Sequence, residues 1–399
     1  MTTDPPAPPS LAQIDAFLAA AEDGDVARLE GLAARQPALI DARGNHGLTA
    51  LAVASERGLL AAVQWLVGRG ADRTDALLFA AQGGALEVVK YLVETGSDPD
   101  GPGKEGTPSA LVCATCFEER HDEVARYLMA RGATIDLFAA VGLGDQALIR
   151  RMAEATPGIL DGAPSPLGGQ PGHGDRPLHL AIQRRRDAAT ALLLLELGAD
   201  AGAQAAFGLT PLTMAVSAGL EEVTARLRRD PGPRTPLELL ALERHDDVRA
   251  RLGPGGQLDL AQVRRYELLH GAAAAGLAGG IGFLVAELRL PPDLPGPSYF
   301  GDAAPQTALV HAVMGGHRAV VEALLRAGAD PNADQGANMT ALHLAAMCGD
   351  VEILRLLAAH GGDLGRRDDR NGGTPLEWAR HNRQGEAAKL LEALGQARA

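Results

Sequence analysis

The sequence has few aromatic residues and carries a negative net charge. Phe, Trp and Tyr together make up 3% of 399 residues, so a hydrophobic core must be built mainly from Ala, Leu and Val. Few aromatic side chains also leave little for a nucleic-acid-binding surface that works by base stacking. The net charge of −13 argues against recognition of a phosphate backbone, which needs a positive surface. We therefore expect no nucleic-acid partner.

Cysteine is equally scarce, since Cys113, Cys116 and Cys348 are the only three in the chain. Three cysteines do not form a disulfide framework, which favours a reducing compartment. The proline-rich segment Met1–Ser10 has no basic region and no apolar core, so it is not a signal peptide, and we expect it to be disordered. Because no apolar run is long enough to span a bilayer, we predict a cytoplasmic protein without membrane contact.

Motifs of the common catalytic sites are also missing. The chain has no Gly-x-Ser-x-Gly elbow and no His-Glu-x-x-His zinc motif. Gly101-Pro-Gly103-Lys104 is the nearest imitation of a phosphate-binding loop, but its glycine spacing is wrong and Glu105 follows the lysine. We therefore expect no enzymatic activity and no cofactor.

One stretch organises the rest of the chain. In Thr340–Asp363, Thr340 is a predicted helix N-cap, and Leu342 and Leu344 with two alanines make a short helix with a small-residue face. Gly349 ends that helix, because glycine adopts turn conformations at little cost. A second helix follows, with four apolar residues at helical spacing (Ile353, Leu354, Leu356, Leu357). The stretch therefore predicts a helix–turn–helix unit.

The opening phrase of this unit recurs along the chain. Related phrases begin at Thr49, Arg176, Thr210, Thr307 and Thr374, and the last two lie 33 residues before and 34 residues after Thr340. A period near 33 with the pattern T-P-L-H-x-A resembles the ankyrin repeat. Arg176-Pro-Leu-His-Leu-Ala and the Gly328-Ala-Asp-Pro-Asn332 turn are similar to the family's sequence.

The resemblance implies an all-α solenoid of about twelve helix-turn-helix repeats in one continuous domain, residues 11–397. Some hairpin loops between repeats are expected to be trimmed, because three intervals shrink to about 25–26 residues, and two are expected to be extended, near 161–175 and 290–305. The expected repeat starts are Asp15, Thr49, Asp75, Ser109, Ile135, Arg176, Thr210, Thr235, Glu267, Thr307, Thr340 and Thr374.

A single unit of this kind cannot fold alone. Ordering its backbone costs about 1–2 kcal/mol per residue, whereas each buried large apolar side chain returns about 1.5–3 kcal/mol. Neighbouring units must therefore cover both faces, and the terminal units must be atypical. The last unit meets this expectation, since Trp378 stands where Leu344 stands one repeat earlier and the following helix carries polar residues such as Glu386 and Lys389.

Cysteine and histidine leave an alternative function open. Cys113 and Cys116 have the CxxC spacing of redox and zinc sites, but no second ligand pair follows, so we interpret them as small buried residues of a first helix. His179 and His343 occupy the T-P-L-H position, where the family's imidazole ties neighbouring turns together. We expect no metal site, and an enzyme or a metal or redox sensor that uses Cys113/Cys116 or a histidine group stays as the alternative.

The favoured function is a non-enzymatic scaffold, expected to be a monomer, that binds another protein through its concave face and long loops. The resemblance implies contact positions in the two residues before the helix-ending glycine. The candidate partner-binding residues there are Glu56, Arg57, Gln82, Gln183, Arg184, Met314 and Met347.

Three aromatic residues complete the candidate set. Phe117 lies in a turn lengthened by two residues and is either exposed or tucked in. Tyr299 and Phe300 lie in a proline-rich loop, where they either anchor a partner or fold back onto the repeat.

Overall fold

The computed structural model describes residues 8–44, 47–101, 108–116, 120–162, 176–183, 187–230, 234–250, 265–296, 305–369, 372–382 and 384–398. Its contacts divide the chain into two compact units. Unit 1 comprises Met1–Gly169 and Arg176–Ala199, and unit 2 comprises Gln170–Asp175 and Asp200–Ala399. Each unit is described by itself.

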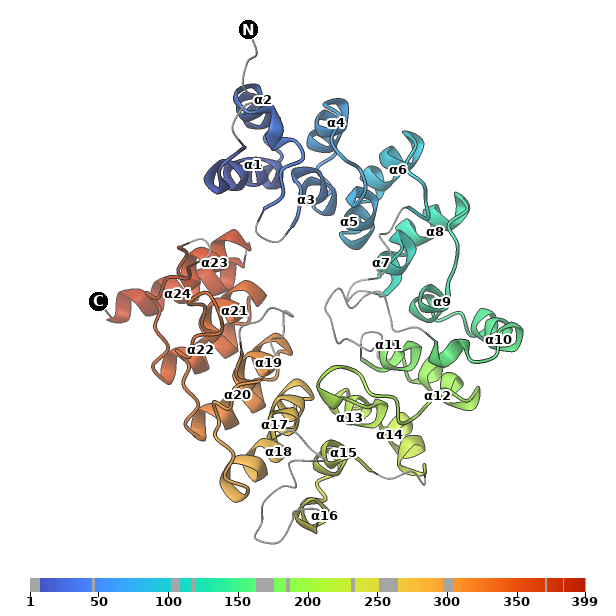
Figure 1. Ribbon diagram of the computed structural model, residues 1–399, viewed down its shortest axis with the longest axis vertical. Helices are drawn as coiled ribbons and strands as arrows, with labels where there is room; N and C mark the ends of the chain where they lie inside the picture. The colour runs from blue at the N-terminus through green and yellow to red at the C-terminus, as the bar shows by residue number, and fades with distance from the viewer. Residues whose placement is uncertain are drawn as a thin grey trace. The chain divides into compact units, whose positions relative to one another are not determined.

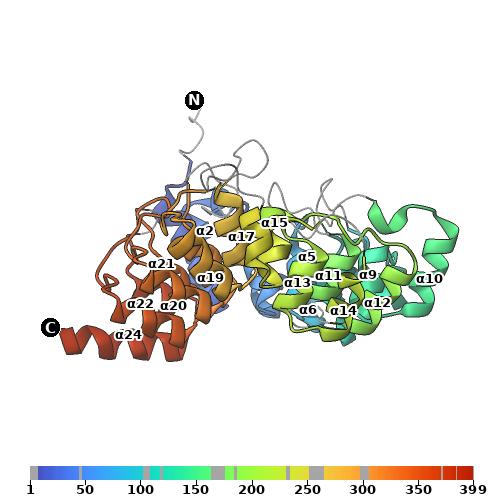
Figure 2. The same cartoon turned by 90° about the horizontal axis from the view of Figure 1, so that it is seen from below.

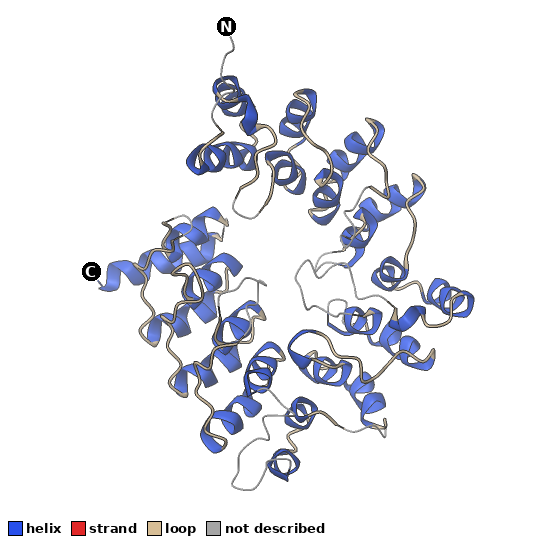
Figure 3. Cartoon of the chain, in the orientation of Figure 1, coloured by secondary structure: helices blue, strands red, loops and turns tan. Residues whose placement is uncertain are grey.

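The regular structure of the described residues is helical (Figure 3). Unit 1 contains α1 (Leu11–Asp23), α2 (Val26–Arg35), α3 (Ala50–Glu56), α4 (Leu60–Gly68), α5 (Ala76–Gln82), α6 (Leu86–Glu94), α7 (Ala110–Cys116), α8 (Asp122–Ala130), α9 (Leu137–Leu143), α10 (Gln146–Ala155), α11 (Pro177–Gln183) and α12 (Ala188–Glu196). Short 3-10 turns lie at Pro37–Leu39 and Ile159–Asp161.

Unit 2 contains α13 (Pro211–Ser217), α14 (Glu221–Arg228), α15 (Pro236–Ala241), α16 (His245–Ala250), α17 (Arg265–Ala274), α18 (Ala278–Gly282), α19 (Ala308–Met314), α20 (Arg318–Arg326), α21 (Ala341–Cys348), α22 (Val351–Ala359), α23 (Pro375–His381) and α24 (Gly385–Arg398). A 3-10 turn lies at Ala206–Gly208, and α18 continues into a π-helical turn, Phe283–Glu287. Within the described ranges the strand-like pairing is one isolated antiparallel bridge, between Gly296 and Gln306.

Odd-numbered and even-numbered helices form separate rows in each unit. In unit 1, α1, α3, α5, α7, α9 and α11 contact one another in sequence, while α2, α4, α6 and α8 form the row outside them (Figure 1). In unit 2, α19 and α21 lie side by side with α20 and α22 in the next row (Figure 2). This arrangement confirms the predicted all-α repeat solenoid.

Threonine and acidic side chains start the helices, as the phrase predicts. The hydroxyl of Thr49 accepts a hydrogen bond from the amide of Ala52 at 3.2 Å, and Thr235 forms a capping box with Glu238. Three expected starts differ from the observed helix starts, and one of them is Glu267, which lies inside α17. Helix α9 is capped by Asp136 rather than Ile135, because only the carboxylate can accept the amide hydrogen bond, and α1 is capped by Ser10, so Asp15 lies inside the helix.

The glycines that end the first helices are contact points between repeats. Gly84 and Gly276 have φ of +67° and +70°, and a Cβ on either would collide with the imidazole of the next repeat, His121 or His317. His121 Nε2 lies 3.0 Å from the carbonyl oxygen of Gln82, and His317 Nε2 lies 2.9 Å from that of Ala274. The turn that ends a first helix is therefore also a point of attachment for the next repeat.

The core consists of small and branched aliphatic side chains. In α21, Leu342, Leu344 and the alanines between them and the turn are at most 1% exposed. In α22, Ile353, Leu354 and Leu357 are fully buried, as their spacing predicts. Full burial of each large side chain is worth about 1.5–3 kcal/mol, so the stacked rows supply the stability that a single pair lacks.

Candidate partner-binding surface

The predicted contact positions lie at the ends of the first helices, where burial changes abruptly. Residues Ala50–Ser55 of α3 are buried, whereas Glu56 and Arg57 are half-buried. Gln82 ends α5 and is half-buried, and Gln183 ends α11 and is exposed. These residues lie at the ends of α3, α5 and α11, in the row of odd-numbered helices of unit 1 (Figure 1).

Charge dominates this surface at the start of unit 1. Arg57 Nη2 lies 3.8 Å from Glu22 Oε1, which links the ends of α1 and α3. Burial raises the pKa of Glu56 above its usual 4.5; Arg57 opposes the rise and Glu22 adds to it. A carboxylate withdrawn from water beside another carboxylate favours a cation in contact with it.

The corresponding positions in unit 2 carry no charge. Met314 and Met347 end or nearly end α19 and α21 and are half-buried, and Cys348 beside Met347 is exposed. Gln384 Nε2 donates a hydrogen bond to the carbonyl oxygen of Met347 at 3.3 Å, which fixes the turn below the methionine. Flexible thioethers at this place offer an adaptable apolar contact.

The remaining candidates, Phe117, Arg184, Tyr299 and Phe300, lie outside the described residues. Their predicted contact roles stay predictions.

Cys113 and Cys116 are fully buried, in agreement with their interpretation as core residues. Burial, with Cys116 adding a smaller effect, raises the pKa of the Cys113 thiol far above its usual 9.0. Cys116 Sγ contacts the carbonyl oxygen of Phe138 at 3.3 Å, across the interface between α7 and α9. Cys116 therefore lies at a repeat interface, and a protonated buried thiol such as that of Cys113 is a poor nucleophile and metal ligand.

Of the T-P-L-H histidines, His270 and His343 join neighbouring turns as predicted, and the contact of His179 is with the start of its own helix. The amide of Arg176 donates to His179 Nδ1 at 3.0 Å, and the amide of Thr340 donates to His343 Nδ1 at 3.1 Å. His270 Nε2 reaches the carbonyl oxygen of Gln306 at 3.1 Å. Within the ranges described, no group of three or more His, Cys, Asp or Glu side chains is arranged to hold a metal ion.

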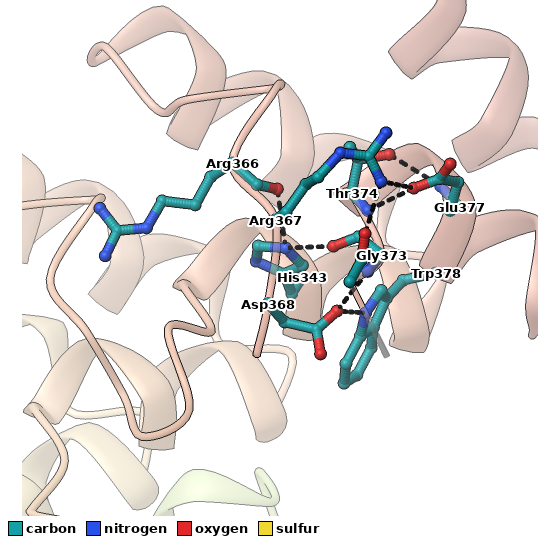
Figure 4. A network of polar contacts seen from close by, with 9 residues as sticks. His343, Arg366, Arg367, Asp368, Gly373, Thr374, Glu377 and Trp378 are labelled. Atoms are coloured by element: carbon teal, nitrogen blue, oxygen red, sulfur yellow. Dashed lines mark hydrogen bonds and ion pairs between the residues drawn. The ribbon is translucent and has the colours of Figure 1, made fainter. Parts of the chain in front are cut away.

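A polar network joins α21 to the last repeat (Figure 4). Asp368 is 2% exposed, and its Oδ2 accepts hydrogen bonds from the indole of Trp378 at 2.9 Å and the amide of Gly373 at 2.8 Å. The His343 ring meets the Trp378 ring edge-on, with 5.7 Å between their centroids. These contacts hold the loop between α22 and α23, described at 360–369 and 372–374, against α21 and α23.

An aromatic row on the outer helices escaped the sequence analysis. Trp65, Tyr91 and Tyr127 are each the sixth residue of a second helix, in α4, α6 and α8, which contact in sequence. All three are half-buried, and the guanidinium groups of Arg69 and Arg131 lie 4.9 Å and 4.8 Å from the first and last rings. The signal was the shared pattern of an aromatic residue followed by Leu, which becomes visible only when the helices are aligned by their starts.

Among the described helices, none combines the length and the apolar character needed to cross a lipid bilayer.

Comparison with known families agrees with this geometry. A family model described as ankyrin repeats (3 copies) matches residues 51–139 and 309–396. The first segment runs from α3 into α9 in unit 1, and the second runs from α19 into α24 in unit 2. Ankyrin repeats generally mediate protein–protein interaction. The match leaves the number of repeats, predicted at about twelve, untested. The stacked helix pairs and the two matched segments show that this chain contains ankyrin repeats.

Proposed function

We propose that the chain is a non-enzymatic scaffold that binds a partner protein through the ends of its first helices. The observation that supports this most directly is the change in burial along each first helix. The preceding residues are buried in the stack, and the last-turn side chains of α3, α5, α11, α19 and α21 reach solvent. A row of partly exposed side chains on rigid helices lowers the ordering cost of binding.

Site-specific photo-crosslinking tests this proposal. A benzophenone side chain placed at Gln82 or Met347 should form a covalent adduct with the partner when the protein is irradiated in the cells that express it. The matched controls carry the same group at Glu87 on α6 and at Arg355 on α22, which are exposed positions on second helices. Adducts at the control positions, with none at Gln82 and Met347, would place the partner on the other face and refute the proposal.

The loop aromatics need a separate experiment. If Tyr299 and Phe300 anchor the partner, a Tyr299→Ala, Phe300→Ala double variant should capture less of it than the intact protein, with unchanged helical content by circular dichroism. Equal capture by both proteins would remove the loop from the binding surface while leaving the helix ends in place.

The proposed setting is a reducing compartment such as the cytoplasm, with the scaffold as a monomer. In support, Cys113, Cys116 and Cys348, all within the described residues, form no disulfide bond. The alternative, an enzyme or a metal or redox sensor, is less favoured because the Cys113 thiol is held in its protonated form by burial. Sedimentation equilibrium tests the monomer, and metal analysis of the purified protein tests the alternative.

A further inference from the structure

One side chain connects α21 directly to the loop that precedes α23. His343 lies in the first turn of α21 and is fully buried. Its Nε2 lies 3.2 Å from the carbonyl oxygen of Arg366 and 3.2 Å from that of Gly373 (Figure 4). Arg366 lies in the middle of the loop and Gly373 lies near its C-terminal end, so a single imidazole N–H holds two separate points of the loop.

The partners of the ring determine its protonation state. Both neighbours of Nε2 are carbonyl oxygens, which only accept, so Nε2 carries the hydrogen. The amide of Thr340 is a donor 3.1 Å from Nδ1, so Nδ1 must present its lone pair. The neutral ring with hydrogen on Nε2 therefore satisfies every neighbour. A second proton on Nδ1 would break the bond from the Thr340 amide and leave the Thr340 hydroxyl, 3.0 Å from Nδ1, as the acceptor on that side of the ring.

We propose that His343, with Asp368 and Trp378, forms an acid-sensitive latch that holds the C-terminal repeat, α23 and α24, on α21. When Nδ1 binds a proton, the bond from the Thr340 amide breaks and a positive charge is placed in a buried site. The loop between α22 and α23 then loses the attachment through His343 and is held by the bonds from Asn338 Nδ2 to the Arg367 carbonyl and from the Asp369 amide to the Ala337 carbonyl, and α23 loosens. Leu342 and Leu344, which are at most 1% exposed on α21, lose their cover.

The charges around the ring set the pH range. Burial is the largest effect and lowers the pKa of His343 below its usual 6.5; the Gly373 and Arg366 carbonyls and the Asp368 carboxylate raise it, and the Arg366 guanidinium lowers it. Because the unfolded chain then binds the proton more readily than the folded chain, the latch is fully stable above pH 6.5 and weakens as pH falls through and below that value.

Other ionisable groups lie on the packed elements, and all of them except the buried His311 are exposed. They are His311 on α19, Glu352 and Arg355 on α22, and Glu377, Arg380 and His381 on α23. Glu377 accepts hydrogen bonds from Thr374, and with Arg367 nearby its pKa is held below the usual 4.5. Glu377 therefore weakens the same repeat only below pH 4.5, and replacing His343 decides whether a transition between pH 6.5 and pH 4.5 belongs to that ring.

Trp378 provides a local reporter for the experiment. The chain contains two tryptophans, so a Trp65→Phe background leaves Trp378 alone. We expect its fluorescence to shift to longer wavelength between pH 6.5 and pH 4.5, as the indole loses its bond to Asp368 and reaches water. In a His343→Gln variant, which keeps an amide N–H but cannot bind a proton, this shift should disappear. The matched control is His360→Gln, at an exposed position of the following turn, which should leave the shift unchanged.

A shift that persists in His343→Gln with the same midpoint overturns the latch. If His343→Gln does not fold at pH 8, hydrogen exchange of the unmodified protein decides instead. Loss of protection at pH 5.5, relative to pH 8 and corrected for the intrinsic rate, should be confined to peptides that contain Thr340 or lie within residues 363–398. Loss spread evenly over unit 2, or no loss at all, contradicts the proposal.

Discussion

Gly142 tests how tightly the repeats of unit 1 are stacked. It lies inside α9 with helical backbone angles, and a Cβ there would lie 2.7 Å from Cys116 Sγ and 2.8 Å from Thr115 Oγ1 on α7. Gly31 in α2 is the matched control, since it is also helical and its Cβ would meet nothing within 4 Å. The two Gly→Ala changes therefore differ in what surrounds the added methyl group.

The expected changes have opposite signs. Alanine in place of a helical glycine stabilises by about 1 kcal/mol, which is the whole effect at the open Gly31. At Gly142 the same gain is opposed by overpacking between α7 and α9, which costs about 1–3 kcal/mol. Gly142→Ala should therefore be neutral at best and destabilising by up to about 2 kcal/mol.

Urea unfolding in a Trp378→Phe background measures the difference, because Trp65 then reports on unit 1 alone. With a denaturant slope of about 1–3 kcal/mol per molar, the Gly31→Ala midpoint should rise by about 0.3–1 M. The Gly142→Ala midpoint should stay level or fall, and Cys116→Ala combined with Gly142→Ala should recover part of the loss. If Gly142→Ala stabilises as much as Gly31→Ala, the α7–α9 interface is looser than the structure indicates and the reasoning fails.

Three further changes follow from buried polar groups. Ser55 Oγ is buried without a hydrogen-bond partner, so Ser55→Ala should leave the free energy of unfolding unchanged or raise it by up to about 1–3 kcal/mol, the desolvation cost of the hydroxyl. The unfolding midpoint should stay level or rise with it. Glu238 accepts hydrogen bonds from the Thr210 hydroxyl at 2.9 Å and the Thr235 amide at 2.8 Å, so Glu238→Ala should cost about 1–3 kcal/mol, measured by urea unfolding followed by circular dichroism. Burial raises the pKa of Glu56, so the folded state holds its proton more tightly and stability falls as pH rises above 4.5; Glu56→Gln should remove this fall in a comparison of unfolding at pH 4 and pH 7.

Local chemistry explains how much of the fold the sequence could predict. A threonine cap, an apolar stripe and a closing glycine lie within one unit, so the phrase beginning at Thr340 predicts both of its helices without knowledge of any neighbour. The predicted helix start at Ile135 was wrong. Isoleucine, placed there by alignment, cannot cap a helix, and the adjacent Asp136 does so. Positions carried over by alignment are therefore less reliable than positions chosen by side-chain chemistry.

Contacts between repeats are the part that a sequence does not specify, because their partners are many residues apart. His121 and Gln82 are separated by 39 positions, and nothing in either local pattern indicates that they meet. The aromatic row of Trp65, Tyr91 and Tyr127 was missed for a similar reason. The intervals between its members, 26 and 36 residues, differ from the repeat period. Residues occupy equivalent places in successive repeats when they lie at the same distance from the start of a helix, whatever the number of residues between them. The helices of one row therefore stay aligned although the loops between the repeats differ in length.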